Sequence, residues 1–390
     1  MSKVIRFLMG VLILLTLFWI GFMAGVVVTS IKDGRVTQYE LLDEAVVLIE
    51  EYFMGDLPDS LVLQRGMIHG MVAKLEDPYT FYVEPAANEL QTDQLVGYYG
   101  GIEAYIHRDE DGSIYLVPFS GGEVEAAGIE ETDRLIAIDG VIIEPEMDLS
   151  TLESMIRGET GSVIVLTFAA RTPGGDSIEI ELIRKNFDIP SVTGYLVPDH
   201  EEIAVLVIER FSDMTLREVR REYDYLVDQG AQGLILDLRG NSGGLLDASI
   251  EVARFFQAHG LVMTERQIGD VEREHYVEEP GAGSEILLVV LVDEGTASGA
   301  EVLAASISDN ARGLLVGTQT YGKGSVQTIL PLSDDSSLHI TMARWMRPNG
   351  TSLDGIGIQP DVLVIDSEDQ HAAIFEVGLQ TLQDQLGISE

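Results

Sequence analysis

The sequence predicts an α/β protein with a parallel sheet and helical crossovers, a β-rich insert, an N-terminal helical region and a single transmembrane helix. Three observations predict this class. Residues 233–256 and 285–311 each have the pattern of a buried strand followed by a helix, an order that produces a parallel sheet. Residues 97–184 contain several short strand patterns separated by Gly or Asp. Residues 7–31 carry no charged side chain.

Composition limits the classes of function. A chain of 390 residues with 46% hydrophobic content is long enough for two or three domains with cores of their own. The net charge of −41 makes nucleic acid and anionic lipid surfaces poor partners for the bulk of the protein, and we interpret the acidity as a source of solubility. The absence of cysteine excludes disulfides, thiolate catalysis and Cys-ligated zinc. The seven histidines form no H-x-x-x-H pair, so the sequence predicts no metal and no cofactor.

The N-terminus has the pattern of a membrane anchor. Lys3 and Arg6 precede 25 uncharged residues, Phe7 to Ile31, where about 20 are needed to cross a bilayer core. Basic residues before the segment and acidic ones behind it predict a cytoplasmic N-terminus, with everything after Asp33 outside. The alternative is a cleaved secretory signal, for which residues 28–30 form a poor cleavage site, but the apolar run is long for a signal core. We therefore expect a single-pass protein of the cell membrane whose bulk is extracytoplasmic.

Helical and then β-rich patterns follow the anchor. Apolar residues recur at three- and four-residue spacing from Thr37 to Leu90, and Pro78 in LEDPYTFY interrupts them. The next segment offers four strand candidates and a short helix over 150–156; the strand candidates are IYLVPF, RLIAIDG, SVIVLTFAA and SIEIELIR. At its start lies YYGGIEA, residues 98–104. Two glycines before a strand can expose backbone N–H groups to a peptide's terminal carboxylate, although such a pair often forms only a turn. The four residues predicted to do this are Tyr99, Gly100, Gly101 and Ile102.

A serine and a lysine in the second half of the chain suggest nucleophilic catalysis. Ser298 lies among Gly295, Ala297, Gly299 and Ala300, which leave room for a substrate main chain. A hydroxyl needs a base, and none of the seven histidines lies in a setting that indicates this role, although one could still reach the serine in space. A lysine base must lose its proton, and lowering its pKa from about 10.4 to 7 or 8 by burial requires about 3–4 kcal/mol.

Lys323 meets this requirement. The chain has only five lysines, and no carboxylate lies beside Lys323 in YGKGSVQ. Gln327, four residues on, can hold a neutral amine by a hydrogen bond without adding charge. G-T-Q-T-Y-G-K (317–323) also matches seven positions of a phosphate-binding loop. Gly324 stands where that motif needs Ser or Thr, and a strand pattern follows in place of a helix, so we exclude nucleotide binding.

The same region offers donors for an oxyanion. Ser298 and Glu301 match a capping box, which would compete for the serine hydroxyl. At the start of the helix the N–H of Gly299 can face a developing oxyanion. A second donor is expected from DLRGNSGG (237–244), a glycine-rich turn after a strand, where we choose Gly243 and Gly244. The alternative is that this turn is only a tight bend.

Seven motifs together resemble one family, the carboxyl-terminal processing peptidases, S41-type serine endopeptidases with a Ser–Lys dyad and an inserted PDZ domain. In chain order they are LEDPYTFYVEP, YYGGI, VEAAGIEETDRLIAIDG, DLRGNSGG, TASGAE, YGKGSVQT and GTSLDGIGIQPDV. The resemblance implies a ClpP/crotonase-like catalytic core in which Ser298 is the nucleophile, Lys323 the general base and Gln327 its orienting partner. It implies an oxyanion hole made by the 237–244 turn and the N–H of Gly299.

The resemblance also implies a function and a division of the chain. We expect a membrane-anchored, extracytoplasmic serine endopeptidase that captures substrate C-termini through its PDZ domain, with an activating adaptor or a homo-oligomer as further partners and no nucleic acid. One alternative is a non-catalytic PDZ adaptor, and another is a lipid or retinoid carrier on a related core. The expected segments are a membrane anchor or signal (1–33), a helical region (34–95), a PDZ domain (96–187), a Ser–Lys protease core (188–366) and a C-terminal helix (367–390).

Overall fold

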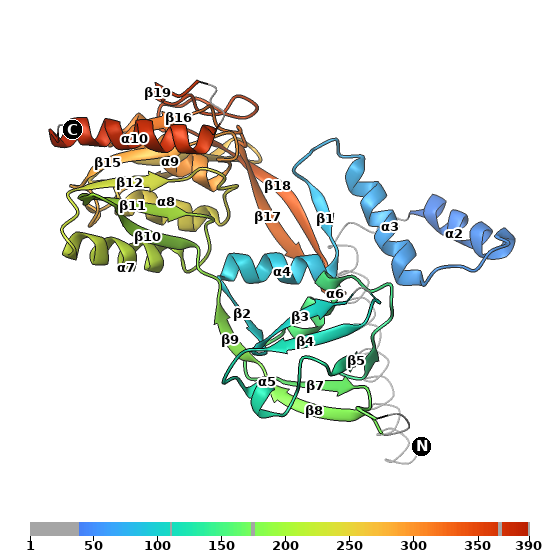
Figure 1. The fold of residues 1–390 in the computed structure, drawn as a ribbon. Helices are drawn as coiled ribbons and strands as arrows, with labels where there is room; N and C mark the ends of the chain where they lie inside the picture. The colour runs from blue at the N-terminus through green and yellow to red at the C-terminus, as the bar shows by residue number, and fades with distance from the viewer. Residues whose placement is uncertain (1–38, 110, 173–175, 366–368, 389–390) are drawn as a thin grey trace, which may run out of the picture. The chain divides into compact units, whose positions relative to one another are not determined.

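The computed structural model describes residues 39–109, 111–172, 176–365 and 369–388 (Figure 1). The expected membrane anchor, residues 7–31, lies outside these ranges. Within them, no helix is both long and apolar enough to cross a membrane. The chain divides into two compact units, of which the first ends at Met67 and the second begins at Ile68. The described part of the first unit holds helix α2 (Glu40–Tyr52) and the start of α3 (Ser60–Ala73), so the expected helices are confirmed.

The strands and helices that follow α3 in the second unit form first a linking segment and then a β-rich module. The segment expected to be helical contains a short strand, β1 (Phe81–Val83), before helix α4 (Pro85–Val96). The module, residues 98–188, consists of β2 (Tyr98–Gly101), β3 (Ala104–Arg108), β4 (Ile114–Pro118), α5 (Glu123–Ala126), β5 (Arg134–Ile138), β6 (Val141–Ile142), α6 (Leu149–Ile156), β7 (Val163–Phe168), β8 (Ile178–Ile183) and β9 (Lys185–Asp188). We call it the β-module. All four strand candidates and the short helix of the sequence analysis are confirmed.

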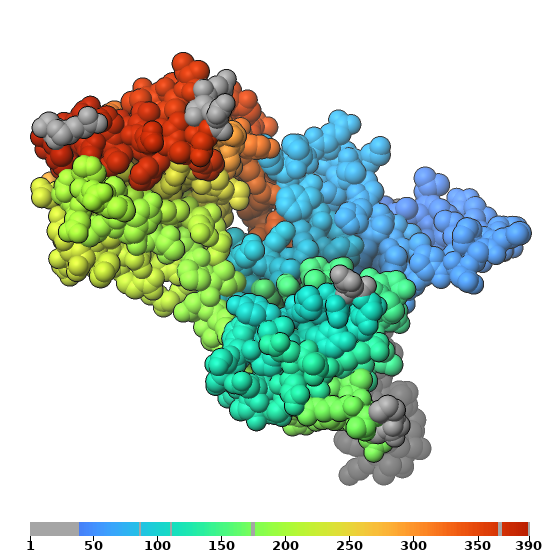
Figure 2. Space-filling view, in the orientation of Figure 1, coloured from blue at the N-terminus to red at the C-terminus, as the bar shows by residue number. Residues whose placement is uncertain are grey.

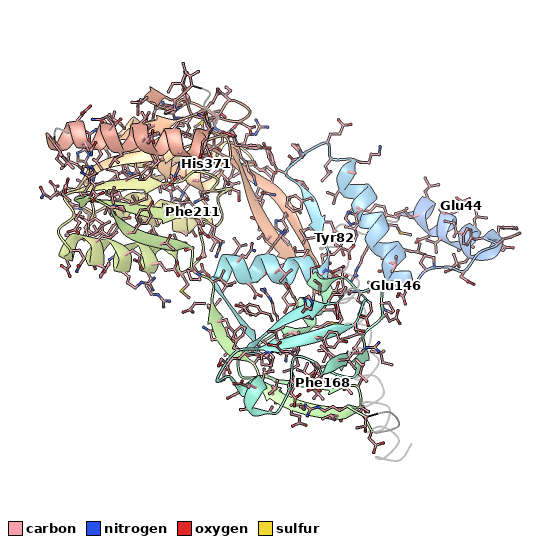
Figure 3. All side chains as sticks on the ribbon, in the orientation of Figure 1. Glu44, Tyr82, Glu146, Phe168, Phe211 and His371 are labelled. Carbon is pink, nitrogen blue, oxygen red and sulfur yellow. The ribbon has the colours of Figure 1, made fainter. Side chains whose placement is uncertain are left out.

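The β-module has a sheet and a hydrophobic core of its own. Its antiparallel sheet has the order β3-β4-β5-β7-β8, with β6 paired to β5, so β3 is an edge strand. Alternate residues of these strands point inward, and Phe168 is one of the largest fully buried side chains (Figure 3). Strands β2 and β9 pair with each other as a separate ribbon where the chain enters and leaves the module.

The remaining chain forms the core that holds Ser298. Its six-stranded sheet has the order β10-β11-β12-β15-β16-β19, parallel except for β10. The strands are β10 (Val192–Val197), β11 (His200–Ile208), β12 (Gly233–Asp237), β15 (Leu287–Val292), β16 (Leu314–Gly317) and β19 (Val362–Leu363); the helices are α7 (Thr215–Asp228), α8 (Leu246–Phe255), α9 (Gly299–Asp309) and α10 (Gln370–Leu386). Both predicted strand-then-helix units are confirmed, as is the parallel pairing of their strands.

Both faces of this sheet are covered by helices. Leu234 and Leu236 of β12 pack into the cluster that includes residues of α7, α8 and α9. Phe211, just before α7, belongs to the same cluster and is fully buried (Figure 3). Ile235, between them, packs with Ile374 and Leu382 of α10. In Figure 2, α10 lies in red across the surface of the core. Strands buried on both faces have continuous apolar sequences, which is why these strands could be recognised.

A second, antiparallel sheet carries Gln327 and His339, which line the same cavity as Ser298. Its order is β1-β18-β13-β14, with β17 paired to β18. The additional strands are β13 (Leu261–Gln267), β14 (Val271–Tyr276), β17 (Ser325–Pro331) and β18 (Ser337–Met346). Strands β17 and β18 pair with each other as an antiparallel hairpin. The pairing of β1 with β18 joins segments more than 250 residues apart, with Phe81 opposite His339.

Candidate active site

Ser298 occupies a strained position at the start of α9. Its φ of 53° lies in the left-handed region, where a residue with a side chain is uncommon. Steric crowding explains why two of the residues around Ser298 are glycines. A Cβ on Gly243 would lie 2.8 Å from the Cβ of Ser298, and one on Gly295 would lie 2.9 Å from the Cα of Gly240. Two backbone turns therefore meet directly beside the serine.

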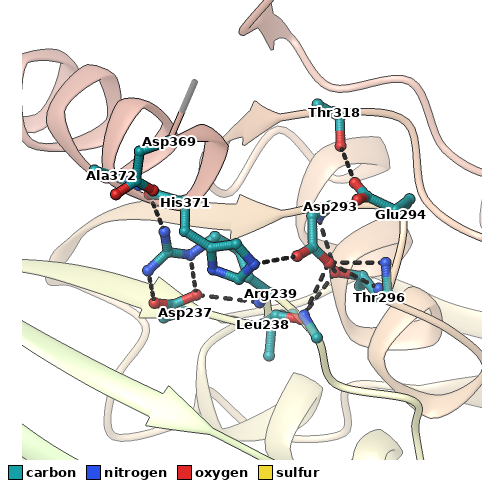
Figure 4. A network of polar contacts seen from close by, with 12 residues as sticks. Asp237, Leu238, Arg239, Asp293, Glu294, Thr296, Thr318, Asp369, His371 and Ala372 are labelled. Carbon is teal, nitrogen blue, oxygen red and sulfur yellow. Dashed lines mark hydrogen bonds and ion pairs between the residues drawn. The ribbon is translucent and has the colours of Figure 1, made fainter. Parts of the chain in front are cut away.

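A buried carboxylate ties these two turns together. Asp293, just after β15, accepts hydrogen bonds at Oδ1 from the backbone N–H groups of Gly240 (2.8 Å) and Gly295 (2.9 Å). Its other oxygen lies 3.5 Å from Nε2 of His371 on α10 (Figure 4). The turn that follows β12 is thereby fixed against the turn that leads to Ser298.

Lys323 lies in the loop before β17, partly buried. Its Nζ donates a hydrogen bond to Oε1 of Gln327 across 2.6 Å and lies 5.2 Å from the centroid of the Tyr79 ring. Burial lowers the pKa of Lys323, and the negative charge of Asp77 acts in the opposite direction. The net shift is toward the neutral amine, the form that can accept a proton.

The orientation of Gln327 is set by a turn that the sequence analysis did not connect to catalysis. Nε2 of Gln327 donates to the backbone carbonyl of Tyr79. A carbonyl only accepts, so the amide must present its NH₂ group to Tyr79 and its Oε1 to Lys323. Asp77 holds the turn by accepting from the Tyr79 N–H (3.1 Å) and the Thr80 hydroxyl (2.6 Å). The signal in the sequence was LEDPYTFY, which we used only as a helix breaker and as a family motif.

Glu301 was predicted only as a capping-box partner and does more than that. Its fully buried carboxylate accepts from the backbone N–H of Ser298 (2.9 Å), as in a capping box. The same oxygen, Oε2, accepts from the N–H of Lys323 (2.9 Å), and Oε1 accepts from the N–H of Gly322 (2.8 Å) and the hydroxyl of Thr320. One side chain therefore fixes the main chains of both predicted dyad residues.

The predicted oxyanion donors differ in availability. The N–H of Gly243 already donates to Oδ1 of Asn241 at 2.8 Å. The N–H groups of Gly244 and Gly299 have no hydrogen-bond partner in the part of the chain that the structure describes. A Cβ on Gly244 would lie 2.1 Å from the carbonyl oxygen of Phe211, so only glycine fits there. The geometry therefore favours Gly244 over Gly243 as the partner of Gly299.

All six residues predicted for catalysis line one cavity of about 540 Å³, the Ser298 cavity. They are Ser298, Lys323, Gln327, Gly243, Gly244 and Gly299. Its walls also include Arg210 and His339. His339 is buried, stacks on Phe81 (4.6 Å between ring centroids) and has no hydrogen-bond partner at Nε2 among the described residues. Burial and then the charge of Lys323 lower the pKa of His339, so this imidazole is a second candidate base in the cavity that the sequence did not reveal.

The four residues predicted to bind a peptide carboxylate lie elsewhere, at the entrance of the β-module. Tyr98–Gly101 pairs with β9, and the carbonyl of Gly100 accepts from the N–H of Gly158. A Cβ on Gly100 would lie 2.1 Å from the Gly158 carbonyl oxygen, which gives this glycine a packing reason independent of any ligand. The Tyr99 ring stacks on Phe187 and is also contacted by the guanidinium of Arg157. Ile102 is buried in the core of the module.

No group of three or more His, Cys, Asp or Glu side chains within the described ranges is arranged to hold a metal ion. The Ser298 cavity brings together a hydroxyl, an amine and an imidazole whose pKa values are both lowered, and backbone donors, which defines a candidate serine hydrolase.

Comparisons with known proteins identify the family. The protein-family model described as "Peptidase family S41" matches residues 202–364 of this chain. The carboxy-terminal processing protease CtpA of Bacillus subtilis (strain 168) is 32% identical over 335 residues, which cover 84% of this chain and 69% of that protein. The chloroplastic C-terminal processing peptidase of Tetradesmus obliquus is 30% identical over 332 residues, 81% of this chain and 71% of that protein. A solved structure of a photosystem II D1 C-terminal processing protease aligns at 29% identity with a TM-score of 0.49, covering 86% of this chain and 90% of that one.

The sequence identity and coverage establish that the chain belongs to peptidase family S41, among the carboxyl-terminal processing proteases. The resemblance inferred from the seven motifs is confirmed. The protein is a serine-type endopeptidase.

Proposed function

We propose that this endopeptidase cleaves peptide bonds with a Ser298–Lys323 dyad on the extracytoplasmic side of a membrane. The observation that carries the proposal is the Lys323 amine, 2.6 Å from the uncharged Gln327 amide in a cavity that Ser298 also lines. No Asp or Glu is among the residues that line this cavity. An amine that is desolvated and has a neutral partner favours its uncharged form, which is the form a general base needs.

The proposed reaction is acyl transfer. Neutral Lys323 accepts the proton of the Ser298 hydroxyl while the oxygen attacks the substrate carbonyl carbon. The N–H groups of Gly244 and Gly299 donate to the developing oxyanion. The ammonium of Lys323 then protonates the leaving amine as the peptide bond breaks, and water repeats the sequence on the acyl-enzyme. Gln327 holds the amine through Oε1 in both protonation states.

We assign the β-module as a PDZ-like domain that captures the C-termini of substrates. Strand β3 is at the edge of the module's sheet, with α6 packed beside it, so an extended peptide can add to its free edge. Tyr99, Gly100, Gly101 and Ile102 directly precede β3, where the terminal carboxylate of such a peptide would lie.

Helix α4 supports a connection between peptide capture and catalysis. Glu89 and Asp93 on α4 accept hydrogen bonds from Ser154 and Arg157, at the end of α6. Other α4 residues line the Ser298 cavity: Gln91, Gln94 and Leu95. A peptide that displaces α6 would therefore move one wall of the cavity. An activating adaptor or a second copy of the chain could act on the same helix.

The membrane location rests on the uncharged segment of residues 7–31 and the basic residues before it. Fusion of a reporter enzyme to the C-terminus of the chain tests the orientation. The proposal predicts activity only for a reporter that functions outside the cytoplasm, and an active cytoplasmic reporter would refute it.

Cleavage of unstructured casein tests the catalytic proposal. We expect the full chain, purified in mild detergent, to cleave casein, with rates reduced at least about 100-fold in Ser298→Ala and in Lys323→Ala. The variant His339→Gln distinguishes the two candidate bases, Lys323 and His339. We expect this variant to keep most of its activity. Equal cleavage by wild type and Lys323→Ala, or loss of activity only in His339→Gln, would remove Lys323 from its role. Binding of peptide C-termini without cleavage by any form would support the adaptor alternative.

A further inference from the structure

The Ser298 cavity has an unusual charge distribution for this protein. The chain carries 65 acidic and 24 basic residues, yet the charged side chains that line the cavity are Arg210 and Lys323, both basic. Under the proposed function Lys323 must be neutral before it reacts. When Lys323 is neutral, Arg210 is the charged side chain that lines the cavity around a bound substrate.

Arg210 is anchored without being neutralised at close range. Its NH2 group donates to the backbone carbonyl of Pro190 at 2.8 Å. The nearest carboxylate, that of Glu209, lies 3.7 Å from NH1 and is 58% exposed, so water screens the pair. By contrast, Arg157 lies 2.8 Å from Asp93. NH1 lies beyond hydrogen-bond distance of Glu209, and the buried Nε has no hydrogen-bond partner among the described residues, so the guanidinium keeps unused donor capacity at NH1.

We propose that Arg210 binds a carboxylate of the substrate in the Ser298 cavity and makes the enzyme prefer acidic peptide segments. The proposal rests on the proposed function, because it takes the cavity to be where the peptide lies during cleavage. A guanidinium presents a planar set of donors that matches a carboxylate, and a fixed guanidinium loses little freedom on binding one. Gln91 and Gln94, which line the cavity from α4, add neutral donors without opposing charge.

Two sources can supply this carboxylate. One is an Asp or Glu side chain near the bond to be cleaved, and the other is the terminal carboxylate of a short C-terminal tail. Both require Arg210, and peptides with amidated or free C-termini distinguish them. Arg210 also holds the segment that leaves the β-module, since Pro190 lies between β9 and β10. A purely structural role through this contact would affect every peptide equally.

The test measures binding in the Ser298→Ala background, where cleavage does not interfere. A fluorescent peptide copied from a casein segment is made with an amidated C-terminus, so that the β-module has no carboxylate to capture. Glu is placed at each position in turn, with the matched Gln peptide as reference, and Kd is measured by fluorescence anisotropy at low salt. We expect at least one position where Glu binds about tenfold more tightly than Gln. In Arg210→Gln this ratio should fall to within about twofold. If the terminal carboxylate is the source, the free-acid peptide shows this Arg210-dependent gain instead.

A second variant separates charge recognition from a structural effect. Because water screens Glu209 from Arg210, the preference for Glu should stay within about twofold of the parent value in Glu209→Gln, while it falls in Arg210→Gln. A preference that survives Arg210→Gln, or no preference for any carboxylate in the parent protein, would overturn the proposal. Failure of wild-type Ser298 protein to cleave the same peptides would refute the proposed function, while the Kd ratios would still decide the role of Arg210.

Discussion

The amine of Lys323 donates to the side-chain oxygen of Gln327 across 2.6 Å, and Gln327 carries no charge. A carboxylate in that place would stabilise the ammonium and keep the base protonated. The charge of Asp77 acts in the opposite direction, since it raises the pKa of Lys323 against the larger effect of burial. Glu301, although it touches the backbone of Lys323, directs its oxygens to N–H and O–H donors. The surroundings of the amine therefore favour its neutral form.

Replacing Gln327 by Glu tests this relationship. A carboxylate beside Nζ raises the pKa of Lys323, and Glu also loses the NH₂ group that donates to the Tyr79 carbonyl. We expect the acidic limb of the pH profile of kcat/KM to move upward by about one pH unit or more, with activity at pH 7 reduced at least about tenfold. Gln327→Met, which removes the hydrogen bond without adding charge, should lower activity without this upward shift. An unmoved limb in Gln327→Glu would contradict the account.

Asp77→Asn should move the same limb in the opposite direction. The Asp77 charge raises the pKa of Lys323, so removing it lowers that pKa and moves the acidic limb to lower pH. Asn keeps an oxygen to accept from the Tyr79 N–H, so the turn should persist. A pH series of initial rates measures the shift. If activity falls uniformly at every pH, the turn acts only on structure and its charge has no part in tuning the base.

Glu301→Gln should damage both stability and catalysis. The carboxylate accepts from four donors, and an amide replaces one acceptor oxygen by an NH₂ group that faces other donors. Leaving a buried donor unsatisfied costs about 2–3 kcal/mol, which urea unfolding can measure. We also expect kcat to fall more than KM rises, because the dyad loses its positioning.

Glu294→Gln is the matched control for this change. Glu294 lies seven residues earlier, exposed in the turn that precedes α9, where it accepts from the hydroxyl of Thr318. Its replacement should change the free energy of unfolding by less than about 0.5 kcal/mol. Equal effects at the two positions would show that Glu301 has no special role.

Lys323→Met should be more stable than the wild type at neutral pH. Since burial lowers the pKa of Lys323 in the folded state, the folded protein carries a cost at pH values below that pKa, where the amine is charged. The cost disappears as pH rises toward the unfolded value near 10.4. The Tm of the variant should therefore exceed that of the wild type by about 2 °C at pH 7, with the difference shrinking toward pH 10. Lys74→Met, at an exposed position, serves as the control, and a difference that grows with pH would contradict the sign.

Local patterns predicted the elements whose residues are buried on both faces. β12 and β15 have continuous apolar sequences because helices cover both sides of their sheet, and the helices after them begin at clear boundaries. Ser298 and Lys323 could be selected because a small-residue turn and a carboxylate-free neighbourhood are visible over a few residues. The sequence predicted only helix over residues 37–90 and therefore did not predict β1, because a strand of three residues is too short to show an alternating apolar pattern.

The contacts that orient the site could not be predicted in this way. The carbonyl of Tyr79 meets Gln327 across 248 positions of sequence, through a backbone atom that every residue possesses. The side-chain oxygen of Asn241 accepts a hydrogen bond from the N–H of Gly243, so this N–H is not free for an oxyanion. This contact can be seen only in the folded turn. Glu301 matched a local capping box, yet two of its partners lie more than twenty residues away. Such contacts depend on tertiary packing and leave no local pattern.

The most direct test of the central claim is the rate at which a fluorophosphonate reagent labels Ser298 as a function of pH, with the labelled residue identified by mass spectrometry. We predict a rate that rises with pH to a plateau, with a midpoint clearly below the usual lysine value of about 10.4, and a reduction of about a thousandfold in Lys323→Met. Labelling that climbs only near pH 10, or that proceeds equally fast without Lys323, would contradict the account.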